Sequence, residues 1–483
     1  MTTARVDAAP LVVDLDGTLT PSDTLHESLL LLAGRSPAQL VCAMWALRKG
    51  RAAFKERVSR LATLDATLLP YREELLSYLR QQRREGRRIV LATAAHEAVA
   101  HAVAGHLGLF DDVLATSADL NLKGRAKLQA IRRLVGPRFV YAGDSRADLP
   151  VWQAASGAIV VGADVRLRAA VERGTPLELT IACKPTALGD WLAAMRVYQW
   201  LKNLLLFVPA LTAFSILEPK HLLSLGVAFL AFGLAASSNY IVNDLLDLPH
   251  DRQHPRKCER AFAAGRIAPM HGAGVAVLGF GLASMLAATL SLPVLGMLWL
   301  YLLVAAAYSA ALKRRVLIDV IALAGLYTLR IVTGSVVTGI AVSKWLLAFS
   351  LFLFLSLALV KRCAELMLAT QAGTTAAPGR GYRTEDLSTL WSFGVAAAVA
   401  AVVVFGLFAS APETLRRYAS PELLWVVAVG LIYWLARLWL VTGRGQMHDD
   451  PLLFALRDRA SRVTVAIMLV ATLAAYFVPM RTG

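Results

Sequence analysis

The chain has 483 residues, of which 57% are hydrophobic and 17% charged, and its formal net charge is +16 at pH 7. This composition is too apolar for an ordinary water-soluble protein, and it excludes a disordered chain, a collagen-like repeat and a disulfide scaffold. In a membrane protein such a positive excess usually marks cytoplasmic loops and suits anionic lipid or phosphate ligands, so we expect no nucleic-acid partner. The 4 cysteines have no metal-binding spacing, which is typical of packing residues in a reducing compartment.

Residues 1–165 are predicted to form a soluble α/β domain that stays in the cytoplasm, because no secretory signal precedes its first strand. Four short apolar runs are expected to be strands: PLVVDLDGTLT, RRIVLATAA, FVYAGDS and GAIVVGA. Helical stretches separate them, which predicts a Rossmann-like parallel sheet whose functional residues gather at the carboxyl ends of the strands. Residues 21–85 have an amphipathic helical pattern and are expected to form a helical cap, whereas residues 166–190 are expected to be a linker.

Four motifs follow one another at the ends of the predicted strands. They are Asp14-Leu-Asp16-Gly17-Thr18, Thr93 in VLATAA, Lys123 and Lys127 in NLKGRAK, and Gly143-Asp144-Ser-Arg-Ala-Asp148. A carboxylate attacks a phosphoryl group only when magnesium and cationic neighbours neutralise the accumulating charge, and these motifs contain the residue types for both. Their order and spacing over residues 10–165 resemble the haloacid dehalogenase (HAD) superfamily. The resemblance implies a phosphatase domain that uses Mg²⁺.

The resemblance also implies a role for each of these residues. Asp14 would be the nucleophile that forms an aspartyl-phosphate, and Asp16 would be the general acid and base. Thr93 would bind the phosphoryl oxygens, and either Lys127 or Lys123 would pair with the nucleophile and the phosphate. Lys127 fits better because it precedes an apolar helical stripe, but the choice stays open. Mg²⁺ would be held by carboxylates and one backbone carbonyl, from Asp14, Asp144, Asp148 and Asp16.

Two features of this domain have simpler interpretations. Asp148 could instead cap a helix or lie on the surface. His96, His101 and His106 are five residues apart and do not share one helix face, so we expect ordinary helix residues and not a set of metal ligands.

From about Leu204 to Phe477, apolar runs of spanning length recur and predict an all-α membrane domain of nine helices within residues 191–483. The runs lie near 204–217, 221–242, 272–291, 293–311, 317–339, 345–360, 391–410, 422–441 and 463–479. If the first domain is cytoplasmic, the segments 243–271, 312–316, 361–390 and 437–462 are cytoplasmic too. These segments carry most of the loop lysines and arginines, which favours this topology in a bacterial-type inner membrane.

An acidic motif begins at Asn243, at the cytoplasmic end of the second predicted helix. Asp244, Asp247 and Asp251 are spaced three and four residues apart and are expected to line one helix face. Three such carboxylates repel one another unless a cation lies among them, and ionisable residues near a bilayer are usually functional. We therefore expect Mg²⁺ bridging to a diphosphate, the alternative being a solvated helix end. The bases that follow would bind the remaining negative charge of the ligand: Arg252, Lys257 and Arg260.

The NDxxDxxxD pattern and the nine predicted helices resemble the UbiA superfamily of intramembrane prenyltransferases over residues 185–480. Further segments resemble its decaprenyl-phosphate phosphoribosyltransferase branch: residues 196–203 with Lys202 and Asn203, the His-Pro and Lys257 run, residues 361–365 with Lys361, Arg362 and Glu365, and residues 450–458. Aromatic prenyltransferases typically carry a second aspartate-rich motif after the sixth helix, where this chain has bases and, further on, Tyr382. A single carboxylate among bases favours phosphoribosyl pyrophosphate as the donor, with its 5-phosphate held by basic residues.

The resemblance implies that Mg²⁺ and the acidic motif, with Asp244 and Asp247 at its centre, hold the leaving pyrophosphate while a polyprenyl phosphate attacks the anomeric carbon. The HAD domain would then remove the 5-phosphate and yield polyprenyl-phosphoryl ribose, a lipid for an arabinofuranose pathway of the cell wall. Substrate contact and interfacial anchoring are both open for Tyr198, Trp200 and Tyr382.

Three further points stay open at this stage. Asp319 and Arg330 lie near one helical repeat apart and could pair with each other or touch substrate. Two other functions remain as alternatives: an aromatic-acceptor prenyltransferase with an unrelated phosphatase, and a lipid transporter with a regulatory head. A homo-oligomer is compatible with the sequence.

Overall fold

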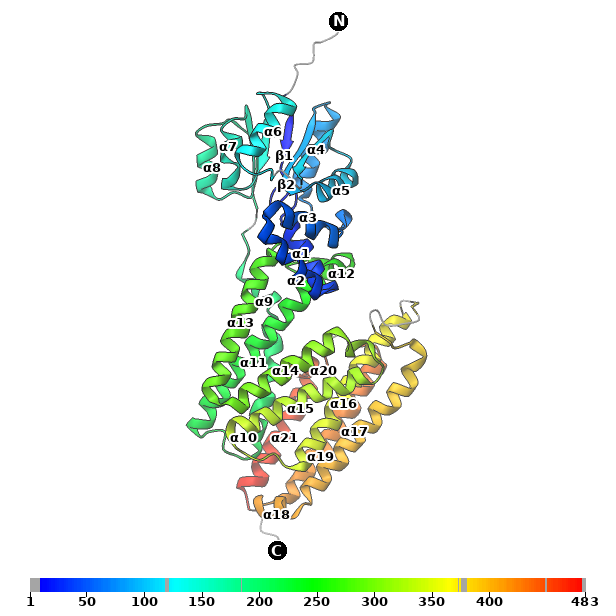
Figure 1. Cartoon of the computed structure of the whole chain (residues 1–483). Coiled ribbons are helices and arrows are strands. Elements are labelled where there is room, and N and C mark those ends of the chain that lie inside the picture. The colour runs from blue at the N-terminus through cyan, green and yellow to red at the C-terminus, as the bar shows by residue number, and fades with distance from the viewer. Residues whose placement is uncertain are drawn as a thin grey trace. The chain divides into compact units, whose positions relative to one another are not determined.

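The computed structural model describes residues 9–117, 121–183, 185–371, 373–374, 380–447 and 450–479 (Figure 1). The chain divides into two compact units. Unit 1 comprises Met1–Arg196 and Tyr240–Leu278, and unit 2 comprises Val197–Asn239 and Gly279–Gly483. The acidic motif therefore belongs to the same compact unit as the N-terminal α/β domain.

Unit 1 contains a six-stranded parallel sheet in the order β3-β2-β1-β4-β5-β6. Val12 pairs with Val90 on one side and with Tyr141 on the other, so β1 lies inside the sheet. The predicted parallel sheet and its four strands are confirmed, and β3 and β6 were not predicted. The strands are β1 (Leu11–Val13), β2 (Ile89–His96), β3 (Asp112–Thr116), β4 (Val140–Gly143), β5 (Gly157–Val161) and β6 (Leu177–Ile181).

The alternation of side chains along the strands gives the sheet two hydrophobic faces. Leu11 and Val13 belong to one buried cluster, whereas Val12 belongs to the cluster on the opposite face, as the period of two along a strand requires. The helices that accompany the sheet are α4 (Glu73–Arg84), α5 (Glu97–Leu107), α6 (Arg125–Val135), α7 (Leu149–Trp152) and α8 (Val165–Glu172). Both faces of the sheet are therefore buried, and the carboxyl ends of its strands remain as the place for a site.

Between β1 and β2 the chain forms three short helices with a small core of their own. They are α1 (Thr24–Arg35), α2 (Pro37–Trp45) and α3 (Arg51–Leu61). Leu32, Phe54 and Val58 are buried in that core. Helices were predicted for this segment, and their action as a cap over a substrate stays a prediction.

The segment 166–190, expected to be a linker, is in large part folded. Residues 165–172 form α8 and residues 177–181 form β6, the edge strand of the sheet beside β5. Leu179 and Ile181 pack on one face of the sheet, whereas Leu177 packs on the other. The apolar and polar residues of β6 alternate as in a strand, and a register shift against β5 places Leu177 on the other face, but Pro176 beside it suggested a loop. The linker expectation is corrected accordingly.

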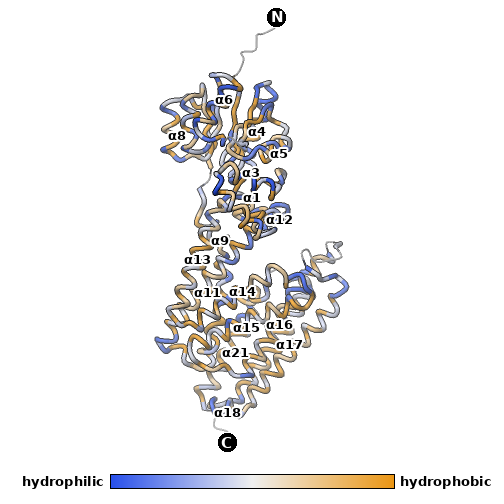
Figure 2. The backbone as a smooth tube through the Cα atoms, in the orientation of Figure 1, coloured by the Kyte–Doolittle hydropathy of each residue, from blue (hydrophilic) through white to orange (hydrophobic). Residues whose placement is uncertain are grey.

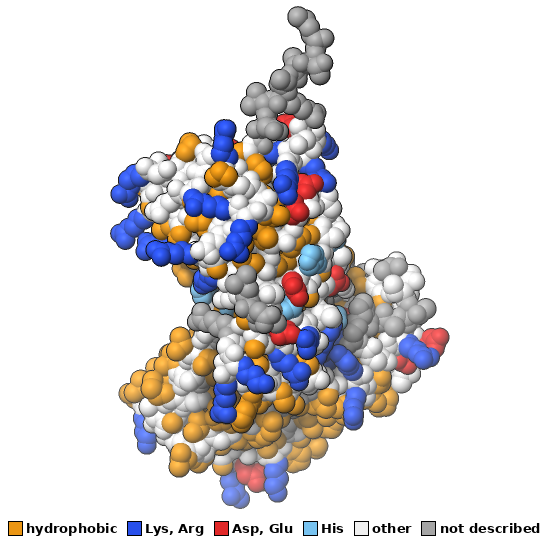
Figure 3. Space-filling view, turned by 45° about the horizontal axis from the view of Figure 1, so that its top comes forward, with side chains coloured by type: hydrophobic (Ala, Val, Ile, Leu, Met, Phe, Trp, Pro, Cys, Tyr) orange, Lys and Arg blue, Asp and Glu red, His pale blue; other side chains and the backbone are white. Residues whose placement is uncertain are grey.

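Eight helices in the described part of the chain are long and apolar enough to cross a membrane. They are α11 (Pro219–Leu246), α13 (Pro269–Leu290), α14 (Leu292–Ala310), α15 (Ile318–Thr338), α16 (Lys344–Gln371), α17 (Leu387–Ala409), α19 (Leu424–Gly443) and α21 (Arg459–Phe477). Hydrophobic residues run along these helices (Figure 2). Many of them are exposed, such as Leu223 at 72% and Leu303 at 67%, and Figure 3 shows hydrophobic side chains over much of the helical surface. Such a surface is expected where helices contact lipid.

The count of nine spanning helices is not confirmed, because the first predicted segment, 204–217, forms no long helix. Residues Val197–Phe207 form a 3₁₀ segment, and α10 (Val208–Thr212) has only 5 residues. Pro209 lies at the start of α10, and Phe214 has a φ of 54°, a left-handed conformation that ends it. Leu206 and Ala210 are fully buried in a core of unit 2, so this run is apolar because it packs inside the protein.

Candidate functional site

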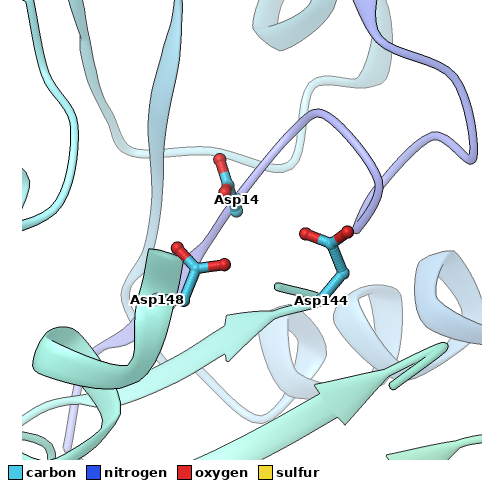
Figure 4. A group of neighbouring side chains, drawn as sticks. All are labelled: Asp14, Asp144 and Asp148. Atoms are coloured by element: carbon cyan, nitrogen blue, oxygen red, sulfur yellow. The ribbon is translucent and has the colours of Figure 1, made fainter. Parts of the chain in front are cut away.

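Three carboxylates meet at the carboxyl edge of the sheet. Asp14 directly follows β1, Asp144 follows the neighbouring strand β4, and Asp148 ends the 3₁₀ turn after it. One oxygen from each carboxylate lies within 4.8 Å of the other two (Figure 4). This convergence brings together three of the residues predicted to hold Mg²⁺. An all-oxygen set of this kind suits a hard divalent cation.

Lys127 is the cation that the structure places beside this cluster. Its Nζ atom lies 2.8 Å from Asp14 Oδ2 and 3.6 Å from Asp148 Oδ1, and the side chain is buried. It also donates a hydrogen bond of 3.0 Å to the hydroxyl of Tyr141, which in turn donates one of 2.8 Å to Asp148. Lys123 is exposed on the lining of the adjacent cavity. The geometry therefore favours Lys127 over Lys123 as the partner of Asp14.

The acidic cluster is short of positive charge. Burial raises the pKa of Asp14, and burial followed by the charge of Asp23 raises the pKa of Asp16 to about 7. Burial and the charge of Asp14 also raise the pKa of Asp144 to about 7. Burial alone would lower the pKa of Lys127, but the surrounding carboxylates raise it. One lysine among these carboxylates leaves an excess of negative charge, which a divalent cation would relieve.

The loop after β1 depends on a glycine. Gly17 has a φ of +77°, and a Cβ atom there would lie 2.1 Å from Asp144 Oδ2, so a side chain would displace a carboxylate of the cluster. Thr18 Oγ1 donates to Asp144 Oδ1 at 3.3 Å. Asp16 Oδ1 accepts the backbone N–H of Thr24 at 2.8 Å at the start of α1. The first motif thus contacts Asp144 through Gly17 and Thr18 and the start of α1 through Asp16.

A cavity of about 420 Å³ opens onto these residues. Asp14, Asp16, Asp144, Asp148 and Lys127 line it, together with residues of α1 and α3. Thr93, predicted to bind phosphoryl oxygens, is fully buried within β2 and accepts the N–H of Ala95 at 3.0 Å. Its side chain lies outside the lining of this cavity.

Several residues of the cavity were not singled out from the sequence. Lys55 of α3 donates to the carbonyl of Ala94 at 2.6 Å, and Ser59 lies 3.1 Å from Nδ1 of His96. His96, expected to be an ordinary helix residue, is the last residue of β2 and caps α5. The periodicity of the sequence predicted a helix around Lys55, but it did not indicate that this lysine would contact Ala94 in β2.

The acidic motif does not lie on one continuous helix face, contrary to the prediction. Helix α11 ends at Leu246, and α12 (Leu248–Gln253) begins with a proline at its second position, so Asp247 lies between two helices. Asp244 and Asp251 are buried, whereas Asp247 is exposed. Asn243 precedes them in α11. The proline separates the motif into two short segments because it cannot continue the hydrogen-bond ladder of α11.

Arginines compensate the buried carboxylates of this motif. Arg260 Nη1 lies 3.1 Å from Asp244 Oδ1 and 2.6 Å from Asp251 Oδ2, and Arg196 Nη2 lies 2.5 Å from Asp244 Oδ1. Lys257 is more distant, at 3.9 Å from Asp251. Arginine side chains are therefore the cations that lie among these carboxylates in the structure, and the Mg²⁺ expected there stays a prediction. Arg196, which was not predicted, contributes to the balance from the segment before the membrane helices.

Arg252, expected to bind ligand, is engaged elsewhere in unit 1. Its Nη1 and Nη2 atoms lie 2.8 Å and 2.6 Å from the two carboxylate oxygens of Glu27 in α1, and its Nε donates to the carbonyl of Ala263 at 3.2 Å. Both charged side chains are buried. The guanidinium is therefore committed to a bidentate ion pair and not to the acidic motif.

Unit 2 contains a second group of the predicted residues. Lys202 Nζ lies 2.8 Å from Asp450 Oδ2, and Lys361 Nζ lies 3.7 Å from the same oxygen. Burial would raise the pKa of Asp450, but Lys202 and Lys361 outweigh it and hold this pKa below its usual range. The structure thus brings together residues that are far apart in the sequence.

Arg362 is buried in an ion network of unit 2. Its Nε atom lies 3.0 Å from Asp319 Oδ2, and its Nη1 pairs with Glu365. The hydroxyl of Tyr382 donates to Asp319, and Arg380 Nε lies 3.2 Å from Glu365 Oε2. Arg362 is therefore a buried structural residue that holds Asp319 and Glu365 in place. Tyr382 is also buried, which argues against interfacial anchoring.

Asp319 and Arg330 do not pair with each other, which was one of the two possibilities left open for them. Asp319 contacts Arg362 and Tyr382, whereas Arg330 donates 3.0 Å hydrogen bonds to Asn203 Oδ1 and to the hydroxyl of Tyr301. Of the aromatic residues left open, Tyr198 is exposed. Trp200 donates to Ser237 at 2.9 Å.

Comparison with known protein families assigns both parts of the chain. Residues 204–456 match the UbiA prenyltransferase family, and residues 11–153 match the haloacid dehalogenase-like hydrolase family. These matches define a membrane transferase fold joined to a hydrolase-like domain. The chain belongs to the UbiA prenyltransferase family and is an integral membrane enzyme with an N-terminal HAD-like domain.

Three relatives illustrate the extent of this similarity. "Uncharacterized protein y4nM" of Sinorhizobium fredii is 42% identical over 94% of this chain and 88% of its own length. "Nodulation protein NoeC" of Azorhizobium caulinodans is 33% identical over 56% of this chain and 88% of its own length. "Decaprenyl-phosphate phosphoribosyltransferase" of Mycobacterium tuberculosis is 31% identical over 58% of this chain and 92% of its own length. The fusion of both parts is thus shared at least with the first of them over nearly the whole chain.

Proposed function

We propose that this enzyme transfers 5-phosphoribose from phosphoribosyl pyrophosphate to a polyprenyl phosphate and then removes the 5-phosphate. The single observation that carries the proposal is the cluster of Asp14, Asp144 and Asp148 with Lys127, in a chain whose membrane part resembles a decaprenyl-phosphate phosphoribosyltransferase. The product of such a transfer carries a phosphomonoester. A phosphomonoesterase in the same chain has that group as its natural substrate.

In the proposed phosphatase step, the Asp14 carboxylate attacks phosphorus and the bond from phosphorus to the ribose oxygen breaks. Asp16 gives its proton to the leaving oxygen, a role suited to a carboxyl group whose pKa burial raises to about 7. Water, deprotonated by Asp16, then cleaves the aspartyl-phosphate and releases inorganic phosphate. Lys127 orients Asp14 and balances charge on the phosphoryl oxygens.

The carboxylates of Asp14, Asp144 and Asp148, with the backbone carbonyl of Asp16, would hold Mg²⁺ in this domain. When bound, the ion supplies positive charge that lets a carboxylate approach an anionic phosphoryl group. The fit rests on the convergence of three carboxylate oxygens within 4.8 Å and on the raised pKa values of Asp14 and Asp144. Thr93, whose side chain does not line the cavity, is proposed to hold the backbone near the end of β2 in place through its hydrogen bond with Ala95.

For the transfer step, we assign the leaving pyrophosphate to the acidic motif. Mg²⁺ and the residues of this motif would bind it together: Asn243, Asp244, Asp247, Asp251, Lys257 and Arg260. Asp244 and Asp251 are buried beside Arg260, whereas Asp247 is exposed. The ion would supply charge to the departing pyrophosphate, as divalent cations commonly do at phosphate sites. Arg260 already bonds to both buried carboxylates, so it would have to share them with the ion or turn toward the pyrophosphate.

The 5-phosphate is assigned to the basic residues of unit 2. Lys202 and Lys361 share one partner, Asp450, which leaves a net positive charge for a phosphate. Other residues of unit 2 are proposed to position the 5-phosphate indirectly. Arg362, Glu365 and Tyr382 would act through Asp319. Asn203 would act through Arg330. The α/β domain is proposed to lie in the cytoplasm, where phosphoribosyl pyrophosphate is made.

The proposal is tested with purified protein, Mg²⁺ and two pairs of substrates. One pair is ribose-labelled phosphoribosyl pyrophosphate with a polyprenyl phosphate, and the other is a polyprenyl diphosphate with an aromatic acid. Lipid-linked ribose label from the first pair is the expected result. Product from the second pair alone would identify an aromatic-acceptor prenyltransferase and overturn the proposal.

A further inference from the structure

The wall of the phosphatase cavity includes a segment that lies more than a hundred residues beyond the HAD-like domain. Ala268, Pro269, Met270 and His271 line the cavity together with Asp14 and the other acids at the strand ends. These four residues follow the acidic motif in the sequence and belong to unit 1 with the α/β domain. The cavity is therefore composite, with one part of its wall contributed by the membrane-domain sequence.

This segment is also the beginning of a membrane-length helix. Helix α13 starts at Pro269, and it is one of the helices that are apolar and long enough to span a membrane. Val277 and Leu278 are exposed at 71% and 74%. They follow His271 by less than two helical turns, or about 9–11 Å along the helix axis. A ligand in the cavity thus lies close to the apolar surface of a spanning helix.

Specific contacts hold the segment against the α/β domain. The buried ion pair of Glu27 with Arg252 joins α1 to α12, and Leu30 of α1 packs against the cluster that contains Leu245 and Phe262. Gly265 has a φ of +68°, and a Cβ atom there would lie 2.6 Å from Pro21 Cγ. A buried, bidentate ion pair fixes geometry well because either partner left alone would be an uncompensated charge.

We propose that this composite cavity selects the phosphomonoester of a membrane-anchored molecule, and that residues 268–271 form the wall that makes the selection. The inference rests on the proposed phosphatase function and adds the residues that select its lipid-linked substrate. A lipid-linked substrate places its phosphate among the acids of the strand ends while its anchor follows the surface of α13. A small soluble phosphomonoester uses only the strand-end part of the cavity. Glu27 and Arg252 act as positioning residues that keep the wall in place.

The test compares two preformed substrates, so that the transfer step is bypassed. Full-length protein in lipid nanodiscs is assayed with polyprenyl-phosphoryl ribose 5-phosphate and with ribose 5-phosphate. The double variant Met270→Ala/His271→Ala is expected to lower the ratio of kcat/KM for the lipid substrate over the soluble one at least tenfold, mainly by raising KM for the lipid. His101→Ala, an exposed histidine of α5 away from the cavity lining, is the matched control and keeps the wild-type ratio.

The ion pair provides a second, independent arm. Glu27→Gln should lower the same ratio, and the exchange Glu27→Arg with Arg252→Glu should restore it in part, which a merely unfolded variant would not do. Equal losses on both substrates without rescue, or a wild-type ratio in the wall variant, would overturn the inference while the proposed function stands. If the wild-type protein does not hydrolyse the lipid substrate at all, the proposed phosphatase function itself fails.

Discussion

The two acidic groups of unit 1 are balanced in different ways. At the strand ends, three converging carboxylates have Lys127 as their close cation, and burial raises the pKa of Asp14 and Asp144. At the end of α11, Asp244 and Asp251 are bridged by Arg260. The first group is therefore short of positive charge, and the second already contains it. The same residue type thus forms a converging acidic cluster in one place and an arginine-bridged ion pair in the other.

This difference has a mechanistic consequence. At the strand-end group a divalent cation would meet three carboxylates that already converge, with Lys127 beside Asp14 and Asp148. At the acidic motif, metal binding has to compete with Arg260 for the oxygens of Asp244 and Asp251. We expect the phosphatase domain to bind Mg²⁺ alone, and the acidic motif to bind it chiefly together with pyrophosphate.

The largest expected effect comes from the strand-end group. Asp14→Asn should reduce hydrolysis of ribose 5-phosphate by roughly a thousandfold or more, because an amide cannot form the aspartyl-phosphate. Transfer of phosphoribose to lipid should continue. Release of inorganic phosphate measures the first activity and lipid-extractable label the second. Asp65→Asn, at an exposed position, is the control. Substantial hydrolysis by Asp14→Asn would exclude this residue as the nucleophile.

Changes at the acidic motif should impair transfer and spare hydrolysis, which is the opposite of the effect of Asp14→Asn. Asp244→Asn should reduce lipid-linked phosphoribose about a hundredfold, because it removes a ligand oxygen and leaves Arg196 and Arg260 without their shared partner. Asp247→Asn, at an exposed position, tests the ligand role without disturbing a buried pair. Hydrolysis of ribose 5-phosphate should be retained in the second variant. Near-normal transfer in both would contradict the assignment of pyrophosphate to this motif.

Lys361 and Arg362 are neighbours in sequence but differ in environment, so their variants should differ too. Lys361→Ala should raise KM for phosphoribosyl pyrophosphate about ten- to a hundredfold, the equivalent of about 1–3 kcal/mol for a lost phosphate contact. Arg362→Ala should mainly lower the melting temperature, since the buried Asp319 would lose its closer arginine and keep only Arg380 at 3.7 Å. Thermal unfolding and KM for both substrates separate these outcomes. An unchanged melting temperature of Arg362→Ala would contradict its structural assignment.

The smallest effect concerns pH. The pKa of Asp144 is raised to about 7 by burial and by Asp14, so this carboxyl gains a proton as the pH falls through 7. The proton competes with a metal ion for the same oxygen, which weakens metal binding at lower pH. The half-saturating Mg²⁺ concentration for ribose 5-phosphate hydrolysis should therefore rise about tenfold from pH 8 to pH 6. A constant value over this range would show that Asp144 is not a ligand.

Local patterns predicted the parts of these sites that are close in sequence. The strand ends with Asp14 and Asp144 follow from short apolar runs that end in acidic turns, and the helical stripe after Lys127 indicated which lysine turns inward. The apolar run at 204–217 was misinterpreted because hydropathy does not distinguish a buried segment from a lipid-exposed one. Pro209 at the start of α10 and the left-handed conformation of Phe214 prevent a long helix in this segment.

Pairings between distant residues could not be predicted. Glu27 and Arg252 are separated by 225 positions, and nothing near either residue indicates the other. Likewise Asp319 was considered with Arg330, its neighbour one helical repeat away, but it pairs with Arg362 of the next helix. Which charged side chains pair depends on tertiary packing, and the spacing of residues along one helix carries no information about that packing.

The most direct test of the account uses phosphoribosyl pyrophosphate labelled with ¹⁴C in the ribose and ³²P in the 5-phosphate. Wild-type protein with Mg²⁺ and a polyprenyl phosphate should give lipid that carries ¹⁴C and progressively loses ³²P to inorganic phosphate. The Asp14→Asn variant should give lipid that keeps both labels in the starting ratio. Wild-type lipid that also keeps both labels indefinitely, or that never acquires ¹⁴C, would contradict the claim that one chain performs both steps.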